Sequence, residues 1–377
     1  MKKLALCAMA AAAVVAACSP KSALTKSGLD PQKFVTTVGE TQTALYSITN
    51  KAGMEVCFTN IGARIVSIMV PDRDGVMRDV VLGFDNVQDY MTHQTDFGAA
   101  IGRYANRIAN ATFTLDDVKY ELPANNNGHC LHGGPNGWQY ACYTAAEVEE
   151  SRIKFTLVSP SGDAGFPGTV NVSVTYSLSD DNALGIYYDA ETDAPTVINM
   201  TNHSYFNLNG DPTKTILNHE LTINASSCTP ADALLIPTGE ITSVEGTPFD
   251  FRTAKTIGQD IETEGDAQLI FGRGYDHNWV LDTACDASKK AAELYCPETG
   301  IKFSVFTSEP GIQVYTGNFL DGTEIGKGGI AYNHRTAVCM ETQHYPDSPN
   351  KPEFPSTVLR PGEKYRSNTT YYFSIVE

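Results

Sequence analysis

The sequence feature that most constrains the fold is a strict alternation of apolar and polar residues between positions 170 and 178. Val170, Val172, Val174, Tyr176 and Leu178 alternate with asparagine, serine and threonine. Side chains along an extended strand point to opposite faces in turn, so this pattern is typical of a β-strand with one buried face. The segment 152–158 repeats the alternation. Any fold for this chain must therefore include a sheet that covers a core.

Most of the remaining sequence is also typical of β-strands. Further runs of strand character, separated by turn signals, are Thr43–Asn50, Met54–Asn60, Ala63–Val70, Asp79–Gly83, Leu184–Ala190, Ile216–Asn224, Trp279–Asp282, Ile301–Thr307, Ile312–Thr316, Ala337–Thr342 and Tyr371–Val376. Helix is predicted only as a single turn at Asn86–Met91 and a short segment at Arg252–Glu264. Many short strands without long helical crossovers predict an all-β protein with a large antiparallel β-sandwich.

Charge and composition narrow the choice of ligand. The net charge of −17 repels phosphate backbones, which argues against nucleic acid and highly phosphorylated ligands but not against a neutral substrate. We find no internal repeat and no change of composition after residue 33 that would divide the chain. A single domain is therefore predicted over residues 34–377.

The N-terminal residues are typical of a targeting segment. Lys2 and Lys3 precede an apolar run from Leu4 to Ala17, which has the length of a signal peptide rather than of a membrane span. The run ends in Val-Ala-Ala-Cys, which resembles a bacterial lipobox, so residues 1–17 are predicted to be removed and Cys18 to carry the lipid. Residues 18–33 then form a tether. We expect a lipid-anchored protein of the bacterial cell envelope, in the periplasm or at the outer membrane; an ordinary signal peptide would give a soluble periplasmic protein instead.

The cysteines give no framework for the fold. The seven beyond Cys18 are widely spaced and include no Cys-x-x-Cys pair: Cys57, Cys130, Cys142, Cys228, Cys285, Cys296 and Cys339. This is neither a zinc motif nor a disulfide scaffold. Most are predicted to be small buried residues, and a disulfide is left open.

Several stretches are more polar, aromatic or glycine-rich than strands and turns require. They are 102–108, 128–134, 201–208, 274–279 and 340–347, with a weaker one at 313–318. His203, within 201–208, is the first candidate for proton transfer because histidine titrates near neutral pH. Glu341 is the most informative acid, since it ends an apolar strand where burial would raise its pKa into the range of a general base.

Some of these residues could also have a purely structural role. Arg107 could be a structural charge partner, and Asp276 could cap a turn. His129 and His132 have the spacing of a metal pair, but the sequence offers no third ligand at a convincing distance, so no metal site is predicted.

Taken together, the motifs resemble the aldose 1-epimerase (galactose mutarotase) family. The resemblance runs from about residue 39 to the C-terminus, and its motifs occur in the family's order: Gly102–Ile108, Leu131–Gly134, Thr201–Leu208, Tyr275–Asn278, Gln313–Gly322 and Glu341–Gln343. The resemblance implies a galactose mutarotase-like supersandwich and an isomerase that interconverts the α and β anomers of aldohexoses. It implies no metal and no cofactor, and a monomer or weak dimer is expected.

The resemblance also implies roles for individual residues. Ring opening removes the proton of the C1 hydroxyl and protonates the ring oxygen, so it needs one base and one acid. The family pattern gives Glu341 as the base, His203 as an imidazolium acid, and His132 as a group near the ring oxygen. The residues that match sugar-binding positions are Asn106, Arg107, Asp276 and Gln313. Tyr205, Phe206 and Trp279 are candidates for the pocket border, with core packing expected for at least two of them.

Other functions stay open at the level of sequence. Asp276 and Glu341 could form the carboxylate pair of a glycoside hydrolase, although the two histidines would then lack a purpose. A non-catalytic sugar-binding lipoprotein would not need an acid and a base. A phosphosugar epimerase is disfavoured by the net charge. The segment Asp260–Gly272 and the acidic region Glu245–Asp250 leave the preferred sugar open.

Overall fold

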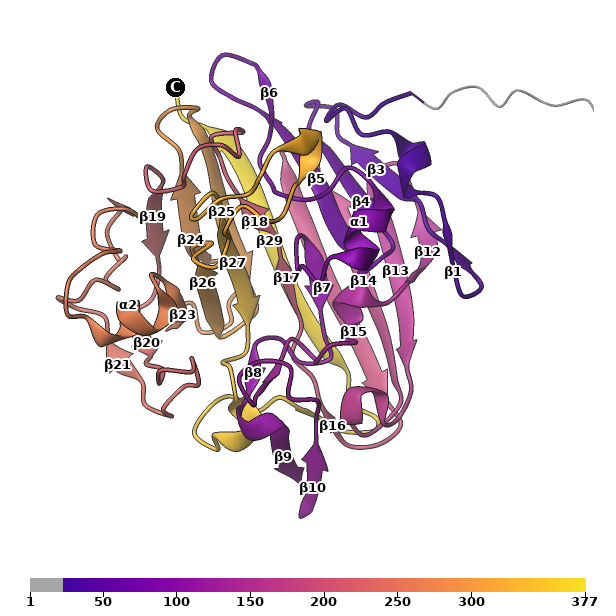
Figure 1. The fold of residues 1–377 in the computed structure, drawn as a ribbon, viewed down its shortest axis with the longest axis vertical. Coiled ribbons are helices and arrows are strands. Elements are labelled where there is room, and N and C mark those ends of the chain that lie inside the picture. The colour runs from indigo at the N-terminus through magenta and orange to yellow at the C-terminus, as the bar shows by residue number, and fades with distance from the viewer. Residues whose placement is uncertain (1–22) are drawn as a thin grey trace, which may run out of the picture.

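The computed structural model describes residues 23–377, and these residues form two packed layers of antiparallel strands (Figure 1). One large apolar cluster lies between the layers and takes side chains from both. The prediction of an antiparallel β-sandwich with very little helix is therefore confirmed. The expected signal peptide and Cys18 lie outside the described residues.

The back layer is a nine-stranded sheet in which every neighbouring pair is antiparallel. Its strands, in spatial order, are β12 (Thr144–Val148), β13 (Arg152–Ser159), β14 (Val170–Leu178), β15 (Ala183–Thr192), β29 (Tyr365–Ile375), β25 (Ile301–Thr307), β24 (Lys290–Tyr295), β19 (Glu220–Ile223) and β22 (Lys255–Thr256). The apolar residues of β14 point into the core, as their alternation predicts. The C-terminal strand β29 lies in the middle of the sheet and joins its two halves.

The front layer consists of two sheets. The six-stranded sheet has the order β18 (Tyr205–Phe206), β27 (Val338–Gln343), β26 (Gly311–Tyr315), β23 (Asp276–Val280), β20 (Ser227–Thr229) and β21 (Thr242–Ser243). The four-stranded sheet is β3 (Leu45–Thr49), β4 (Glu55–Thr59), β5 (Arg64–Pro71) and β6 (Met77–Asp79). A single bridge between Val81 and Phe206 links them. Phe206 stacks on Phe303 of β25 and so ties the front layer to the back.

Five short strand pairs in the described part of the chain lie outside these sheets. They are β1 (Thr37–Val38) with β2 (Thr41–Gln42), β7 (Ala99–Ile101) with β17 (Thr201–His203), β8 (Arg107–Ile108) with β11 (Cys130–Leu131), β9 (Thr112–Leu115) with β10 (Val118–Glu121), and β16 (Thr196–Val197) with β28 (Val358–Leu359). Single turns of 3₁₀ helix occur at Pro31–Phe34, Ala109–Ala111, Trp138–Tyr140, Asp163–Gly165, Lys327–Gly329 and Ser348–Asn350. The pairs β7–β17 and β8–β11 matter most, because they present residues of the polar stretches.

Of the two predicted helices, one is present in the structure and the other is not. Helix α1 (Val87–Thr92) is confirmed, and the side chain of Asn86 caps it by accepting the backbone N–H of Asp89. The helix predicted at Arg252–Glu264 is wrong: that segment contains β22 and turns, and Lys255 donates to Asp260 at 2.8 Å across them. Helix α2 (Ala267–Gly272) follows instead, where Asp266 accepts two backbone N–H groups as its N-cap.

The segment expected to be a tether contacts the domain as far as it is described. The backbone N–H of Lys26 donates to Glu55 at 2.7 Å, and Leu29 is buried at 3% exposure. Phe34 is fully buried. The chain is therefore packed against β4 from about residue 26, ahead of the domain start that was predicted at residue 34.

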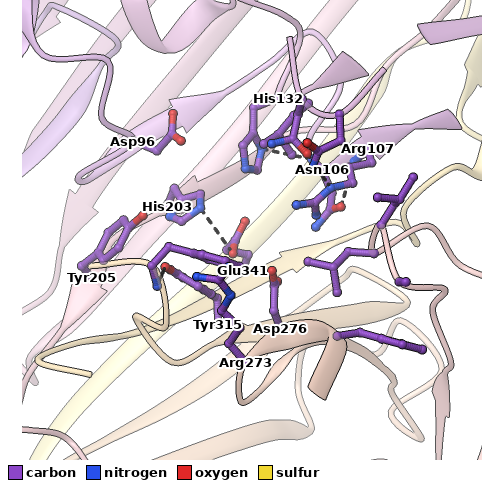
Figure 2. Close-up of a pocket in the computed structure, with 18 residues that line it drawn as sticks. Asp96, Asn106, Arg107, His132, His203, Tyr205, Arg273, Asp276, Tyr315 and Glu341 are labelled. Carbon is purple, nitrogen blue, oxygen red and sulfur yellow. Dashed lines mark hydrogen bonds and ion pairs between the residues drawn. The ribbon is translucent and has the colours of Figure 1, made fainter. Parts of the chain in front are cut away.

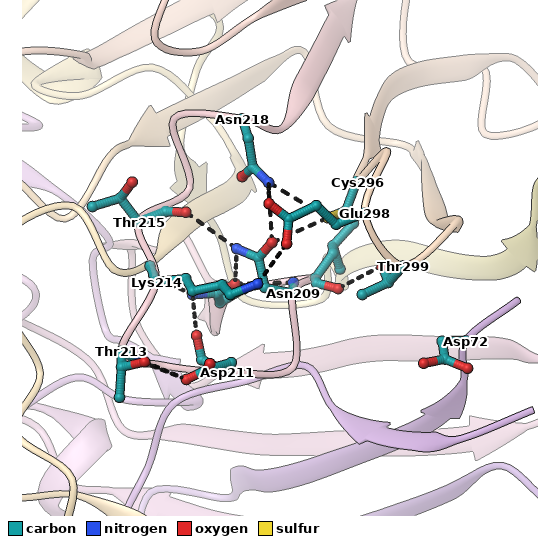
Figure 3. A network of polar contacts seen from close by, with 12 residues as sticks. Asp72, Asn209, Asp211, Thr213, Lys214, Thr215, Asn218, Cys296, Glu298 and Thr299 are labelled. Carbon is teal, nitrogen blue, oxygen red and sulfur yellow. Dashed lines mark hydrogen bonds and ion pairs between the residues drawn. The ribbon is translucent and has the colours of Figure 1, made fainter. Parts of the chain in front are cut away.

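A network of polar contacts anchors the chain just after β18 (Figure 3). The side chain of Asn218 donates to Asn209 at 3.1 Å and to Glu298 at 3.2 Å, and Lys214 pairs with Glu298 at 2.6 Å. Thr299 donates its hydroxyl to the backbone oxygen of Leu208 at 2.8 Å. This network fixes the downstream end of the stretch 201–208, and it shortens the strand predicted at Ile216–Asn224 to β19.

All seven cysteines beyond Cys18 are unpaired thiols, and six of them are buried or half-buried. Between residues 23 and 377, none of the helices has both the length and the apolar character that crossing a bilayer requires.

Candidate active site

The six-stranded sheet has one apolar face and one polar face, and the polar face forms the floor of the site. In β27, Val338 and Met340 point into the core between the layers, whereas Glu341 points the other way. Alternate residues of a strand must do this because the side-chain period is two. The same alternation in β26 sends Ile312 and Val314 to the core. A buried carboxylate therefore follows from its place in an otherwise apolar strand.

Strand register brings the floor residues together. Gln313 of β26 lies directly opposite Glu341 of β27, and Asp276 of β23 lies opposite Tyr315 of β26. Directly opposite residues share a face of the sheet. The Nε2–H of Gln313 donates to Oδ1 of Asp276 at 2.7 Å. Asp276 begins β23, so it is a strand residue and not the cap of a turn.

His203 ends β17 and faces this floor. Its Nε2 lies 3.5 Å from Oε1 of Glu341, and the two side chains are 6% and 2% exposed. The ring stacks on Tyr205 with centroids 5.0 Å apart. Ser204 donates both its backbone N–H and its hydroxyl to Oδ1 of Asn202, whose amide donates to the backbone oxygen of Gly98. These bonds fix the backbone on both sides of His203.

The loops around β8 and β11 supply the third wall. The backbone N–H of Asn106 donates to Nδ1 of His132 at 3.1 Å, and the backbone N–H of His132 donates back to the carbonyl of Asn106. Since Nδ1 accepts, the neutral His132 ring carries its proton on Nε2. The Nε–H of Arg107 donates to Oδ1 of Asn126 at 3.2 Å. A Cβ on Gly133 would lie 2.3 Å from the carbonyl of Gly102, so glycine is required for the two loops to approach this closely.

These walls enclose a cavity of about 410 Å³ (Figure 2). Its volume lies in the range of small-molecule sites. The residues that line it are Asp96, Asn106, Arg107, Asn126, Asn127, Leu131, His132, His203, Tyr205, Ala233, Leu234, Leu235, Phe271, Arg273, Asp276, Tyr315, Phe319 and Glu341. Polar groups from distant segments thus converge on one space, as expected for a binding site with orienting contacts.

Burial sets the protonation states of the central pair. Burial, with the nearby carboxylates of Asp276 and Asp96, raises the pKa of Glu341 well above its ordinary range, while Arg107 opposes the shift. Burial lowers the pKa of His203 to about 3. It also lowers the pKa of His132 well below the usual value, together with His203 and Arg107. Burial thus disfavours the charged forms of both histidine rings and of the Glu341 carboxyl group. The imidazolium expected for His203 has to form against this effect of burial.

The structure brings six of the seven expected catalytic and binding residues to the cavity: Asn106, Arg107, His132, His203, Asp276 and Glu341. Gln313 is not among the lining residues; it lies opposite Glu341 on the same face of the sheet, and its amide donates to Asp276. Of the three aromatic candidates, Tyr205 lines the cavity. Phe206 and Trp279 are fully buried in the core, which confirms that at least two of the three have a packing role.

Several lining residues were missed from the sequence. Asp96 and Arg273 stand in stretches with no recognisable motif, and Leu234 comes from a loop. Phe271 and Phe319 lie in the named segments Asp260–Gly272 and Gln313–Gly322, but were not singled out there. Tyr315 fell within the weaker stretch 313–318. Asp96, His132 and His203 also place ligand-type atoms within 4.8 Å of one another.

Comparisons with known proteins agree with this geometry. The sequence model of the family described as aldose 1-epimerase matches residues 44–372. The chain is 43% identical over 314 residues to galactose mutarotase from Bos taurus, covering 83% of this chain and 89% of that protein. It is 39% identical over 331 residues to aldose 1-epimerase from Escherichia coli K12, covering 87% and 94%.

Solved structures show the same fold. An aldose epimerase homologue from C. elegans superposes with a TM-score of 0.83 at 33% identity, over 89% of this chain and all of that one. Galactose 1-epimerase from Lactobacillus acidophilus NCFM gives a TM-score of 0.80 at 25% identity, over 91% and 97%. Fold and site together define a carbohydrate isomerase on a mutarotase-type β-sandwich. The chain belongs to the aldose 1-epimerase family.

Proposed function

We propose that this protein interconverts the α and β anomers of aldohexoses by acid–base ring opening, with Glu341 as the base and His203 as the acid. The observation that carries the proposal is the buried contact of 3.5 Å between His203 Nε2 and Glu341 Oε1 on the wall of a sugar-sized cavity. The reaction breaks and re-forms the bond between C1 and the ring oxygen, and the protein has to supply only proton transfers. These two groups are the kind that move protons near neutral pH.

The proton count of the pair fits the reaction. When the shared proton is on His203, Glu341 is a carboxylate and removes the proton of the C1 hydroxyl. His203 gives its proton to the ring oxygen as the bond from C1 to that oxygen breaks. The products are an open-chain aldehyde, a neutral His203 and a protonated Glu341, and no proton is gained or lost overall.

The surroundings favour this intermediate state. Burial raises the pKa of Glu341 and lowers the pKa of His203, so the neutral pair is the form that the site stabilises. Ring opening converts the ion pair into this neutral pair and therefore proceeds toward the form preferred by a low-dielectric cavity. Rotation about the bond from C1 to C2 then presents the other face of the aldehyde, and the same two groups act in reverse to close the ring.

The remaining polar walls would hold the sugar in place. His132 presents Nε2–H as a donor, which suits the ring oxygen as its charge builds up. Arg107 and Asp276 offer a charged donor and an acceptor for ring hydroxyls, and Asn106 shapes the loop that carries Arg107. Gln313 orients Asp276 by donating its amide N–H to Oδ1 of that residue. Positioning of this kind lowers the barrier by keeping the reacting atoms aligned.

Polarimetry tests the proposal directly. Freshly dissolved α-D-glucose and α-D-galactose should reach their equilibrium rotation faster with the protein than in the same buffer without it. A boiled sample is the control for buffer catalysis. If neither sugar is accelerated, the proposed activity is wrong.

We further propose that the protein is anchored through a lipid on Cys18 at the bacterial cell envelope and works there as a monomer or weak dimer. The lipobox-like sequence before Cys18 supports the anchor. An enzyme in this place would meet sugars as they enter the cell. A Cys18→Ala protein that still fractionates with membranes would contradict the anchor, and light scattering of the soluble domain would test the oligomeric state.

A further inference from the structure

The carboxylate of Asp96 neither gives nor takes a proton in the transfers described above, although it lines the same cavity and helps to raise the pKa of Glu341. Asp96 lies in the loop before β7, and its Oδ1 is buried without any hydrogen-bond partner in the protein. A buried polar oxygen left unpaired costs free energy, so a native protein keeps one only with a compensating use. An unpaired acceptor on a cavity wall suits a ligand that brings a donor.

The neighbouring cation does not use this oxygen. Arg64 is fully buried and donates to the backbone carbonyls of Thr95, Phe97 and Gln139 at 2.8–2.9 Å. Burial raises the pKa of Asp96 to about 6, while the charge of Arg64 and the side chain of Tyr140 oppose this shift. Neither Arg64 nor Tyr140 donates a hydrogen bond to Oδ1 of Asp96. At neutral pH Asp96 is therefore mostly an anion whose Oδ1 is free to accept a hydrogen bond.

Asp96 lies beyond His203, as seen from Glu341 (Figure 2). Its carboxylate is within 4.8 Å of the ligand-type nitrogens of His132 and His203, and in Figure 2 the ring of His203 stands between Asp96 and Glu341. This step rests on the proposed function, in which Glu341 meets the C1 hydroxyl and His203 meets the ring oxygen. Along a pyranose, the atoms that follow the ring oxygen on the side away from C1 are C5 and its substituent C6.

We propose that Asp96 forms a subsite for the C6 hydroxyl of an aldohexose. Oδ1 of Asp96 accepts the hydrogen bond from that hydroxyl, and the contact pairs an oxygen that is otherwise buried alone. The subsite selects aldohexoses with a free C6 hydroxyl over 6-deoxyhexoses and aldopentoses. It also disfavours hexuronic acids, because a second carboxylate would face Asp96 across a low-dielectric cavity.

The test compares sugars that differ only at C6. For the wild-type protein, kcat/KM for D-galactose should exceed that for 6-deoxygalactose (fucose of the same configuration) and L-arabinose (which lacks C6) by about 10- to 100-fold, as for loss of a hydrogen bond to a charged group. Asp96→Ala should reduce this ratio to near one, mainly through a higher KM for galactose. Asp96→Asn keeps an acceptor oxygen and should restore part of the ratio, and it should raise activity on galacturonic acid.

Asp72→Asn is the matched control. Asp72 is a buried carboxylate that pairs with Arg78 at 2.9 Å and lies outside the cavity. Its replacement should leave the ratio between galactose and 6-deoxygalactose unchanged. If Asp96→Ala and Asp96→Asn also leave the ratio unchanged while lowering Tm, Asp96 serves only to balance Arg64, and the subsite is wrong.

Binding measurements separate this proposal from the activity itself. Calorimetry with Glu341→Gln should show tighter binding of galactose than of 6-deoxygalactose, and Asp96→Ala in that background should remove the difference. This outcome would support the subsite even if polarimetry showed no mutarotation. Binding of Zn²⁺ that requires Asp96 and excludes galactose would instead make the oxygen a metal ligand and overturn the proposal.

Discussion

Two buried contacts between a histidine and a glutamate lie at the end of β27, and they differ in how completely their atoms are paired. His203 and Glu341 approach to 3.5 Å across the cavity. His344, which follows β27, lies only 2.6 Å from Glu309. Both glutamates are 2% exposed. His203 is 6% exposed and His344 is 23% exposed, so the same residue types form one loose contact deep in the cavity and one tight contact nearer the surface.

The two pairs also differ in whether their polar side-chain atoms have hydrogen-bond partners. Nδ1 of His203 and Oε2 of Glu341 are buried without protein partners. No side-chain atom of His344 or Glu309 is left in that condition, and the backbone N–H of His344 donates to Asn199 at 3.0 Å. A satisfied pair is a structural link, whereas unpaired atoms at a cavity are available to a ligand. We therefore assign the chemistry to the loose pair and a structural role to the tight one.

The largest expected effect is that of Glu341→Gln. The amide has the shape of the carboxyl group but cannot remove the proton of the C1 hydroxyl, so kcat should fall by about 10²- to 10⁴-fold. Tm should stay unchanged or rise, since no intact hydrogen bond is lost and a costly buried acid is removed. Polarimetry and calorimetry on the same preparation measure both quantities.

Glu309→Gln is the matched control for that experiment. The variant weakens the short contact with His344, so it should lower the free energy of unfolding by about 1.5–3 kcal/mol, as for other hydrogen bonds to charged groups. Its kcat should stay within about twofold of wild type, since Glu309 lies outside the cavity. A loss of activity in Glu309→Gln as large as that in Glu341→Gln would erase the distinction between the two pairs.

A second comparison uses two histidines whose pKa values are lowered equally by burial. Burial lowers the pKa of both His203 and His219 to about 3. Nε2 of His219 accepts the backbone N–H of Leu208 at 2.8 Å, and its Nδ1 lies 2.8 Å from Oδ1 of Asn218. His203→Asn should therefore lower kcat by about 100-fold with little change in Tm. His219→Asn should cost about 1–3 kcal/mol of stability and keep the kcat of the folded protein. Activity loss without destabilisation in His219→Asn would contradict the assignment.

The pH dependence of the free energy of unfolding measures what the buried carboxylate of Asp96 costs. The pKa of Asp96 is raised in the folded state from 3.8 to about 6. The unfolded chain thus releases this proton first, and the contribution of Asp96 to stability falls as the pH rises from about 4 to 6. Asp96→Asn lacks this loss. Relative to wild type, the variant should be about 1–2 kcal/mol more stable at pH 7.5 than at pH 4.5. A difference that does not change with pH would show that Asp96 titrates as an ordinary surface acid.

The pattern of strands was accessible from the sequence because burial imposes a period of two on residues such as those of β14. The sheet order was not, since β29 pairs with β15 and β25, and those contacts join residues far apart along the chain. Helix α2 was missed because six residues carry too little periodicity, and its main signal is the single N-cap Asp266. Among these features, only those set by residues close together in the chain could be predicted from the sequence.

Prediction of the site residues from the sequence is limited in the same way, since contacts between distant segments are not visible in it. His203 and Glu341 stand in recognisable motifs, whereas Asp96 reaches the cavity only because β7 pairs with β17, with Ala99 opposite His203. Gln313 was expected to touch the sugar, since its residue type and motif suit that role. Strand register places it opposite Asn278 and Glu341, and its amide donates to Asp276. A motif does not distinguish a residue that contacts the ligand from one that supports such a residue.

The smallest expected effect concerns this supporting contact. Gln313→Met keeps the length of the side chain and removes the N–H that donates to Asp276, so Asp276 loses the bond that orients it. We expect KM for galactose to rise about fivefold with kcat nearly unchanged, which is the loss of roughly one neutral hydrogen bond. The stability should change little because Oε1 of Gln313 is buried without a partner, and methionine removes that unpaired acceptor. If Gln313 acts only through Asp276, its replacement should have no further effect in an Asp276→Ala background, whereas independent effects that multiply would mean that Gln313 contacts the sugar itself.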